Sequence, residues 1–159
     1  MNSFPTYEWA EFCGDVTETI PHDFPEPLGK DLDLCMTCDS NNAGEKQTRC
    51  SCTGFLIFCN MALIDWISKK QATIETSHFG AEFIAMKHGN EKLRGLRYKL
   101  RMMGIPLTEP FFVYCDNKLQ LTNSTRPELT LKKKCNSICY HAVQESVAMG
   151  ESKPIYQTL

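Results

Sequence analysis

The hydrophobic pattern changes period near the middle of the chain, and this change predicts strands first and helices afterwards. Three short apolar segments, separated by turn-forming residues, are typical of a meander of three antiparallel strands. These segments span residues 32–38, 55–59 and 62–67. From Ser77 onward, apolar residues recur every three or four positions as far as Met103, which predicts one long helix that stops before Gly104 and Pro106.

A second pattern begins at Phe111, where five large, mostly apolar residues run directly into Asp116 and Asn117. A short segment that is apolar on both faces is typical of a buried strand in a parallel or mixed sheet. Asp116 then lies at the carboxyl end of that strand, where open α/β sheets bind ligands, although taken alone it is equally well explained as a helix N-cap. Two helices and a final strand complete the predicted order βββαβααβ, over residues 117–124, 130–149 and 154–159.

Composition and charge change this picture mainly at the amino end. The chain has 159 residues, of which 42% are hydrophobic and 23% charged, and this is the balance of one soluble α/β domain. Residues 1–31 are rich in proline, and we expect an irregular acidic arm packed on a domain over residues 32–159. Residues 1–45 hold ten acidic residues against one basic residue (−9), whereas the remainder holds 16 basic against nine acidic residues (+7). The basic part can meet a polyanion, and the acidic part would repel one.

The sequence carries no sign of a signal peptide or of a membrane span. The first twelve residues lack a basic segment and an apolar stretch, and the longest apolar run, over residues 53–64, is too short to cross a bilayer. We therefore expect an intracellular protein, cytoplasmic or nuclear, without a membrane partner.

Nine cysteines without a secretory signal indicate reduced thiols rather than disulfides. Cys35 and Cys38, followed by Cys50 and Cys52, suggest a Cys-rich zinc-binding module as one alternative. Against zinc, residues three apart on a strand point to opposite faces of the sheet, and the second pair has an unusual spacing.

Three carboxylates are predicted to meet at one end of the sheet. Asp39 follows the first strand, Asp116 follows the fourth, and Glu82 lies in the first turns of the long helix. If the first and fourth strands are neighbours, the two aspartates lie side by side, and a helix that crosses the sheet can bring Glu82 over them. Clustered carboxylates repel one another unless cations neutralise them, and oxygen ligands favour Mg²⁺ or Mn²⁺. From the spacing alone, acids that are merely buried or that cap helices remain the commoner explanation.

Six ordered motifs connect this chain to a known family. The family pattern is roughly D-A-D-x-A-G, T-R-R-S-x-T-G, S-K-K-Q, S-x-x-E-A-E-Y, Y-x-D-N and Y-H-x-x-R-E. The corresponding segments here begin at Asp39, Thr48, Ser68, Ser77, Tyr114 and Tyr140. Over residues 32–150 the chain therefore resembles the ribonuclease H domain of copia-type (Pseudoviridae) retrotransposon Pol polyproteins. The acidic arm is similar to the family's segment between reverse transcriptase and ribonuclease H.

The resemblance implies a ribonuclease H-like fold, a five-stranded mixed sheet flanked by helices. It implies endonucleolytic cleavage of the RNA strand of RNA–DNA hybrids, with 3′-hydroxyl and 5′-phosphate products. Asp39 would bridge two Mg²⁺ or Mn²⁺ ions, Glu82 and Asp116 would be further ligands, and a metal-bound water would be the nucleophile. The implied partners are the hybrid and the reverse transcriptase region of the same polyprotein.

The chain also departs from the family pattern. The family has a fourth aspartate just after the last strand, and this sequence stops at Leu159 before that segment. Cys50 and Gln144 stand where the family usually has arginine. A catalytically dead relic of the same fold, which at most binds nucleic acid, is therefore an alternative to an active enzyme.

Several basic or polar side chains are candidates for contacts with the hybrid backbone. Arg94, Arg97 and Arg101 are spaced to share one face of the long helix, opposite its apolar stripe. A solvated charged face is the commoner reason for such spacing. The further candidates are Lys69, Lys70 and Asn117. His78, His88 and His141 have no spacing that requires a role.

Overall fold

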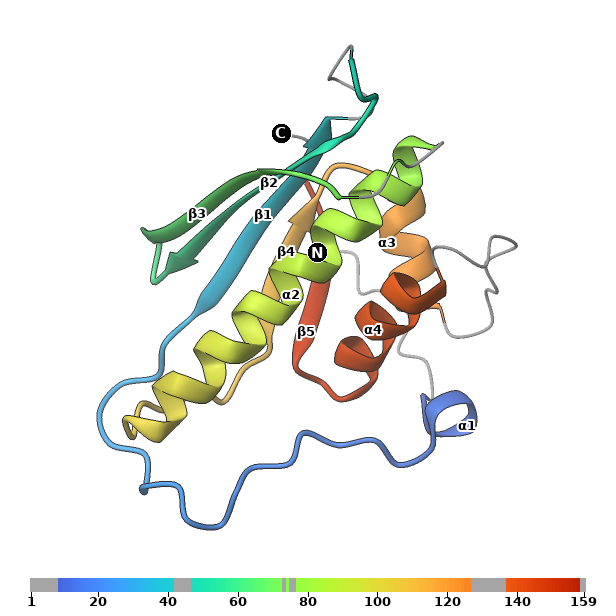
Figure 1. The fold of residues 1–159 in the computed structure, drawn as a ribbon. Helices are drawn as coiled ribbons and strands as arrows, with labels where there is room; N and C mark the ends of the chain where they lie inside the picture. Colours follow the sequence, from blue (N-terminus) through green and yellow to red (C-terminus); the bar gives the residue numbers. More distant parts are fainter. Residues whose placement is uncertain (1–8, 42–46, 73, 75–76, 127–136, 158–159) are drawn as a thin grey trace.

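The computed structural model describes residues 9–41, 47–72, 74, 77–126 and 137–157. Its elements are α1 (Ala10–Cys13), β1 (Leu34–Asn41), β2 (Cys52–Cys59), β3 (Ala62–Lys70), α2 (His78–Met102), β4 (Phe111–Cys115), α3 (Lys118–Thr125), α4 (Ser137–Ala148) and β5 (Ser152–Tyr156). The five strands form one sheet in the order β3-β2-β1-β4-β5 (Figure 1). The β1–β2 and β2–β3 pairs are antiparallel, and the β1–β4 and β4–β5 pairs are parallel.

The predicted mixed five-stranded sheet is confirmed, but the bounds of its first strand are not. We expected Asp39 to follow this strand, whereas β1 starts two residues later and continues past Asp39 to Asn41. The reason is backbone pairing, since Asp39 pairs with Gly54 and Asn41 with Cys52 in the antiparallel ladder. Backbone hydrogen bonds between paired strands form whether or not the side chains are apolar. A strand can therefore continue beyond its last apolar residue, where the hydrophobic pattern has already stopped.

The hairpin between β2 and β3 closes through Asn60 and Met61, where the sequence predicted a turn. Cys59 pairs with Ala62, which leaves a two-residue loop. Both loop residues have positive φ angles, 47° and 69°, as a type I′ turn requires. The Asn60 side-chain oxygen also accepts a hydrogen bond of 2.9 Å from the Asp33 backbone amide, which ties the hairpin to the start of β1.

The long helix α2 begins where the sequence predicted. Ser77 has an extended backbone, and its side chain accepts a 3.2 Å hydrogen bond from the Gly80 amide, as an N-cap does. The helix ends at Met102 and is followed by Gly104 at a φ of +73°. Met103, which we placed on the apolar stripe, lies beyond the helix and is 73% exposed. The predicted helix over residues 130–149 is described from Ser137, and its first part lies outside the described residues. The predicted last strand over residues 154–159 corresponds to β5, which spans Ser152–Tyr156, and residues 158–159 lie outside the described residues.

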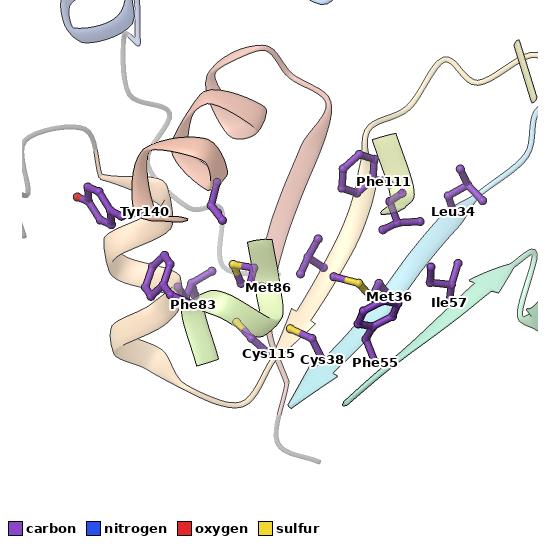
Figure 2. Close-up of a cluster of buried hydrophobic side chains, with 14 of the residues drawn as sticks. Leu34, Met36, Cys38, Phe55, Ile57, Phe83, Met86, Phe111, Cys115 and Tyr140 are labelled. Atoms are coloured by element: carbon purple, nitrogen blue, oxygen red, sulfur yellow. The ribbon is translucent and has the colours of Figure 1, made fainter. Parts of the chain in front are cut away.

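One face of the sheet packs against α2, α3 and α4 and carries the core. Alternate residues of β1 and β4 are buried, as the period of two in a strand requires. Figure 2 shows Met36, Ile57 and Phe111 of the sheet with Phe83 and Met86 of α2 in this cluster. The helix approaches the sheet closely, because a Cβ added at Gly89 would overlap the Sδ atom of Met36. On the other face, the paired residues Leu56 and Trp66 are exposed, by 42% and 67%.

The amino-terminal segment runs beside the carboxyl end of α2 (Figure 1). From Trp9, where the described residues begin, it contains the short helix α1 and no other helix or strand before β1. The Leu28 amide donates to the Gly104 carbonyl at 2.8 Å, and the rings of Phe24 and Tyr98 meet edge to face at 4.9 Å. The division into an arm over residues 1–31 and a domain over residues 32–159 remains a prediction.

Candidate active site

The parallel pairing of β1 with β4 brings Asp39 and Asp116 to the same end of the sheet. Thr37 pairs with Tyr114, so the same register continued by two residues sets Asp39 beside Asp116. Both aspartates are exposed. In the sheet order β1 and β4 are neighbours, which is the condition under which we predicted the two aspartates to lie side by side.

Glu82 reaches this end of the sheet from α2 and is only 4% exposed. Its Oε1 atom lies 2.8 Å from Nε2 of His78, one turn earlier on the helix. Its Oε2 atom accepts a hydrogen bond from the side-chain amide of Asn117. The oxygen of that amide caps α3, because it accepts from the backbone amides of Leu119 at 2.8 Å and Gln120 at 3.3 Å. Asn117, the residue directly after Asp116, therefore connects the start of α3 to the Glu82 carboxylate.

The charges of Asp39 and Asp116 act on the Glu82 carboxylate. Burial raises the pKa of Glu82, and the charges of Asp116 and Asp39 raise it further, against the opposing effects of Asn117 and His78. Burial also raises the pKa of the Cys38 thiol, with contributions from Asp39, Glu82 and Asp116. The pKa of Cys115 rises to about 12 for the same reasons, burial first and then Asp116 and Glu82. The site is thus electronegative, and both thiols beneath it stay protonated.

The donor set at this site suits a hard divalent cation. Asp39, Glu82 and Asp116 offer carboxylate oxygens, which Mg²⁺ and Mn²⁺ prefer. Each oxygen of Glu82 has one hydrogen-bond partner and retains a further lone pair for a cation. Within the described residues, however, no group of three or more His, Cys, Asp or Glu side chains is arranged so that it could hold a metal ion. The carboxylate oxygens are therefore suitable ligands for a divalent metal ion, but the described side chains do not surround one ion position.

The four cysteines of the zinc alternative do not support that alternative. Along β1, the side chain of Cys38 is on the buried face, and Cys35 is on the other face and only partly buried. Cys50 is 8% exposed and Cys52 is partly buried. Strand alternation separates the first pair, as the sequence argument stated.

The expectation that three arginines of α2 form a solvent-facing surface is wrong for Arg97, whereas Arg94 and Arg101 are partly exposed and their contact with nucleic acid remains a prediction. Arg97 is 3% exposed and donates to the carbonyl oxygens of Leu107 at 3.1 Å and Glu109 at 2.7 Å. Arg97 and Arg101 both pair with Glu18 of the arm. Arg94 pairs with Glu151 at 2.6 Å. Helical spacing correctly placed these side chains near one another, but it could not show that the arm pairs with two of them.

The other predicted nucleic-acid contacts lie in two places. Lys69 and Lys70 are exposed at the end of β3, the strand at the sheet edge. Asn117 uses its amide inside the protein, on Glu82 and on the start of α3. Sequence reasoning missed His78 as a partner of Glu82, although the spacing of four residues on one helix was a signal for that contact.

The amino-acid sequence is similar to part of known polyproteins. No protein-family model matches the chain. The retrovirus-related Pol polyprotein from transposon RE1 of Arabidopsis thaliana is 27% identical over 128 residues, which cover 80% of this chain and 9% of that protein. The Pol polyprotein from transposon TNT 1-94 of Nicotiana tabacum is 29% identical over 119 residues, 75% of this chain and again 9% of that protein. The chain thus spans a small part of the curated relatives that it matches.

Solved structures agree with the fold. LC11-RNase H1, isolated from compost, has a TM-score of 0.59 at 14% identity, over 79% of this chain and 84% of that chain. The N-terminal RNase H domain of rv2228c from Mycobacterium tuberculosis has a TM-score of 0.56 at 11% identity, over 78% and 84%. The chain has the ribonuclease H fold and is homologous to copia-like retrotransposon Pol polyproteins. In this ribonuclease H-like domain, no helix among the described residues is long and apolar enough to cross a membrane.

Proposed function

We propose that this ribonuclease H-like domain is a metal-dependent endonuclease that hydrolyses the RNA strand of RNA–DNA hybrids. The observation that supports the proposal is that Asp39 and Asp116 lie at the same end of the neighbouring parallel strands β1 and β4, and that their charges act on Glu82 of α2. A solved complex of LC11-RNase H1 with an RNA/DNA hybrid has a TM-score of 0.55 to this chain, at 12% identity over 79% of it and 85% of that chain. This likeness supports a hybrid as the substrate.

Asp39, Glu82 and Asp116 are the proposed ligands of two Mg²⁺ or Mn²⁺ ions. When bound, the ions would supply the positive charge that stabilises the attacking and leaving oxygens of an in-line displacement. The two exposed aspartates face solvent, where a phosphodiester can approach. Asn117 and His78 hold the buried Glu82 carboxylate in place by contacts to its two oxygens. The products would carry 3′-hydroxyl and 5′-phosphate ends.

The proposed partners follow from the relatives. These relatives are Pol polyproteins, so the reverse transcriptase region of such a polyprotein is the proposed neighbour of this domain. The foamy viral protease–reverse transcriptase in complex with an RNA/DNA hybrid contains a chain segment with a TM-score of 0.51 to this one, at 10% identity. That segment covers 90% of this chain and 20% of the viral chain.

The test is cleavage of an end-labelled RNA–DNA hybrid in Mg²⁺ and in Mn²⁺. We expect metal-dependent cutting that falls about 10³-fold in Asp39→Asn and Asp116→Asn, because several kcal/mol of charge stabilisation is lost. Asp65→Asn is the matched control, since this aspartate lies on β3 of the same sheet but pairs with Lys92 at 3.1 Å. Cutting that persists in both site variants would refute the assignment of the residues.

A remnant of the same fold that binds hybrids without cleaving them is the second candidate. The observation that favours it is the lack, within the residues that the structure describes, of carboxylates already arranged around an ion position. A folded protein that binds the hybrid and cuts it in neither metal would establish this second function and exclude the first.

A further inference from the structure

Two buried glutamines hold the backbone of α2 at the position of Glu82. Gln71 follows β3 and is 3% exposed, and Gln120 lies in α3 and is 2% exposed. The Gln71 side-chain amide donates to the Ala81 carbonyl at 2.9 Å, and the Gln120 side-chain amide donates to the Glu82 carbonyl at 3.0 Å. Two elements that are far apart in sequence thus bind consecutive carbonyls of the same helix.

Gln71 connects this part of α2 to the sheet. The same side-chain nitrogen also donates to the Thr53 hydroxyl of β2 at 2.9 Å, so its two amide hydrogens bridge strand and helix. The Gln71 backbone amide donates to the Ser51 carbonyl at 2.8 Å, which fixes the residue itself. The Gln71 side-chain oxygen has no partner among the described residues although it is buried. Burying an amide oxygen without a hydrogen-bond partner lowers the free energy of unfolding. Stability alone therefore does not explain a glutamine at position 71.

Gln120 connects the same helix to the other side of the site. It lies in the first turn of α3, whose start is capped by Asn117, the residue that binds the Glu82 carboxylate. The backbone of Glu82 is therefore held by α3 through Gln120, and its carboxylate is held by the same helix through Asn117. Buried hydrogen bonds of this kind fix a functional group to within a small range of positions.

We infer that Gln71 and Gln120 are positioning residues, which set the location of the Glu82 carboxylate relative to Asp39 and Asp116. The inference rests on the proposed function for its catalytic meaning. The two hydrogen bonds to α2 are present without a bound ion, so their effect on the position of Glu82 can be tested whether or not the protein is a nuclease.

The chain offers a matched control for this inference in a third buried glutamine. Gln144 of α4 is 5% exposed, and its side-chain amide donates to the Asn123 and Arg126 carbonyls and to the Tyr140 hydroxyl. It therefore joins α4 to the α3 region and has no contact with Glu82. The substitutions Gln71→Met, Gln120→Met and Gln144→Met remove the same chemical group from equally buried positions.

The experiment compares these three variants with the unmodified chain in metal-free and metal-containing solution. Urea denaturation first establishes that each variant is folded. Free Mn²⁺ measured by electron paramagnetic resonance then gives the affinity for Mn²⁺. We expect about 10-fold weaker Mn²⁺ binding in Gln71→Met and Gln120→Met, the size of effect seen when the hydrogen-bond partners of metal ligands are removed, and no change in Gln144→Met. Hybrid cleavage should show a lower kcat with an unchanged KM in the first two variants alone.

Amide hydrogen exchange at residues 82–86 tests the inference without metal or turnover. We expect faster exchange there in Gln71→Met and Gln120→Met than in Gln144→Met at equal global stability. If Mn²⁺ neither binds nor supports cleavage in the unmodified chain, the proposed function fails, and the exchange rates still decide the inference. Exchange rates in the first two variants that match those of the Gln144 variant would overturn it.

Discussion

The strongest prediction about stability concerns the contact between the arm and α2. Glu18 pairs with Arg97 through Nε at 3.1 Å and Nη2 at 3.3 Å, and it also pairs with Arg101. The side chain of Arg97 is 4% exposed and that of Glu18 is 21% exposed. Glu18→Gln removes the negative charge while the shape of the side chain is retained.

The magnitude follows from the burial of the two partners. Breaking a fully buried ion pair costs about 3–5 kcal/mol, and breaking an exposed pair costs about 1 kcal/mol or less. Glu18 lies between these limits, and Arg97 keeps the carbonyls of Leu107 and Glu109 as partners. We therefore expect Glu18→Gln to lower the free energy of unfolding by about 2 kcal/mol at pH 7.

The effect should depend on pH in a defined direction. Burial alone would raise the pKa of Glu18, but the hydrogen bonds and charges of Arg97 and Arg101 outweigh it and lower the pKa below 4.5. A carboxyl group with a lowered pKa stabilises the folded state above its unfolded pKa, and this stabilisation is lost as the pH falls through the folded pKa. The difference between the unmodified chain and Glu18→Gln should therefore be constant above about pH 5.5 and shrink below pH 4.5.

Urea denaturation followed by tryptophan fluorescence at pH 7 and at pH 3.5 measures both quantities. Glu91→Gln is the control, because Glu91 pairs with Lys87 at 2.8 Å on the same helix but is 53% exposed. We expect that control to cost about 0.5 kcal/mol or less. Equal effects of the two substitutions at pH 7 would refute the argument that burial of Arg97 sets the magnitude.

Three further predictions concern single positions. Glu82→Gln should abolish cleavage. In the absence of metal it should raise the free energy of unfolding by on the order of 1 kcal/mol at pH 7, because burial raises the pKa of Glu82 and so disfavours its charged form. A lower melting temperature of the variant would contradict this. Met61→Gly should stabilise the chain by about 0.5–1 kcal/mol in urea denaturation, since the turn holds Met61 at a φ of 69°; an unchanged midpoint would contradict it. Gly89→Ala forces the flexible end of the buried Met36 side chain to move, at a cost of about 1 kcal/mol that offsets the gain in helix propensity, whereas Gly95→Ala, with open space around it, should stabilise by about 1 kcal/mol; equal effects of both would contradict the close helix–sheet approach.

Local sequence signals accounted for much of the fold. The N-cap at Ser77, the turn at Asn60 and Met61 and the buried strand at Phe111–Cys115 each depend on a few neighbouring residues. Such features are governed by local backbone preference and by the period of apolar residues, which a single sequence displays. The predicted ends of the strands were less accurate, because backbone pairing with a neighbouring strand extends a strand beyond its apolar residues.

The candidate site was partly accessible from the sequence. The three carboxylates were named from their places relative to the predicted strands and helix, and the parallel pairing of β1 with β4 brings the two aspartates together as expected. Glu82 was placed on the correct helix, but its burial and its contacts with His78 and Asn117 come from packing. Gln71 ends the S-K-K-Q motif, but no sequence pattern indicated the hydrogen bonds of Gln71 and Gln120, since each joins elements that are distant along the chain.

The sequence by itself thus determined the kinds of elements, their order and the acids at the ends of two strands. Only the tertiary structure decided which neighbours those elements have. Arg94, Arg97 and Arg101 illustrate the difference, because helical spacing set them near one another. Their partners come from the arm, from the loop before β4 and from Glu151, just before β5. The physical reason is that spacing along one helix is a local property, whereas burial of a charge depends on whatever chain folds over it.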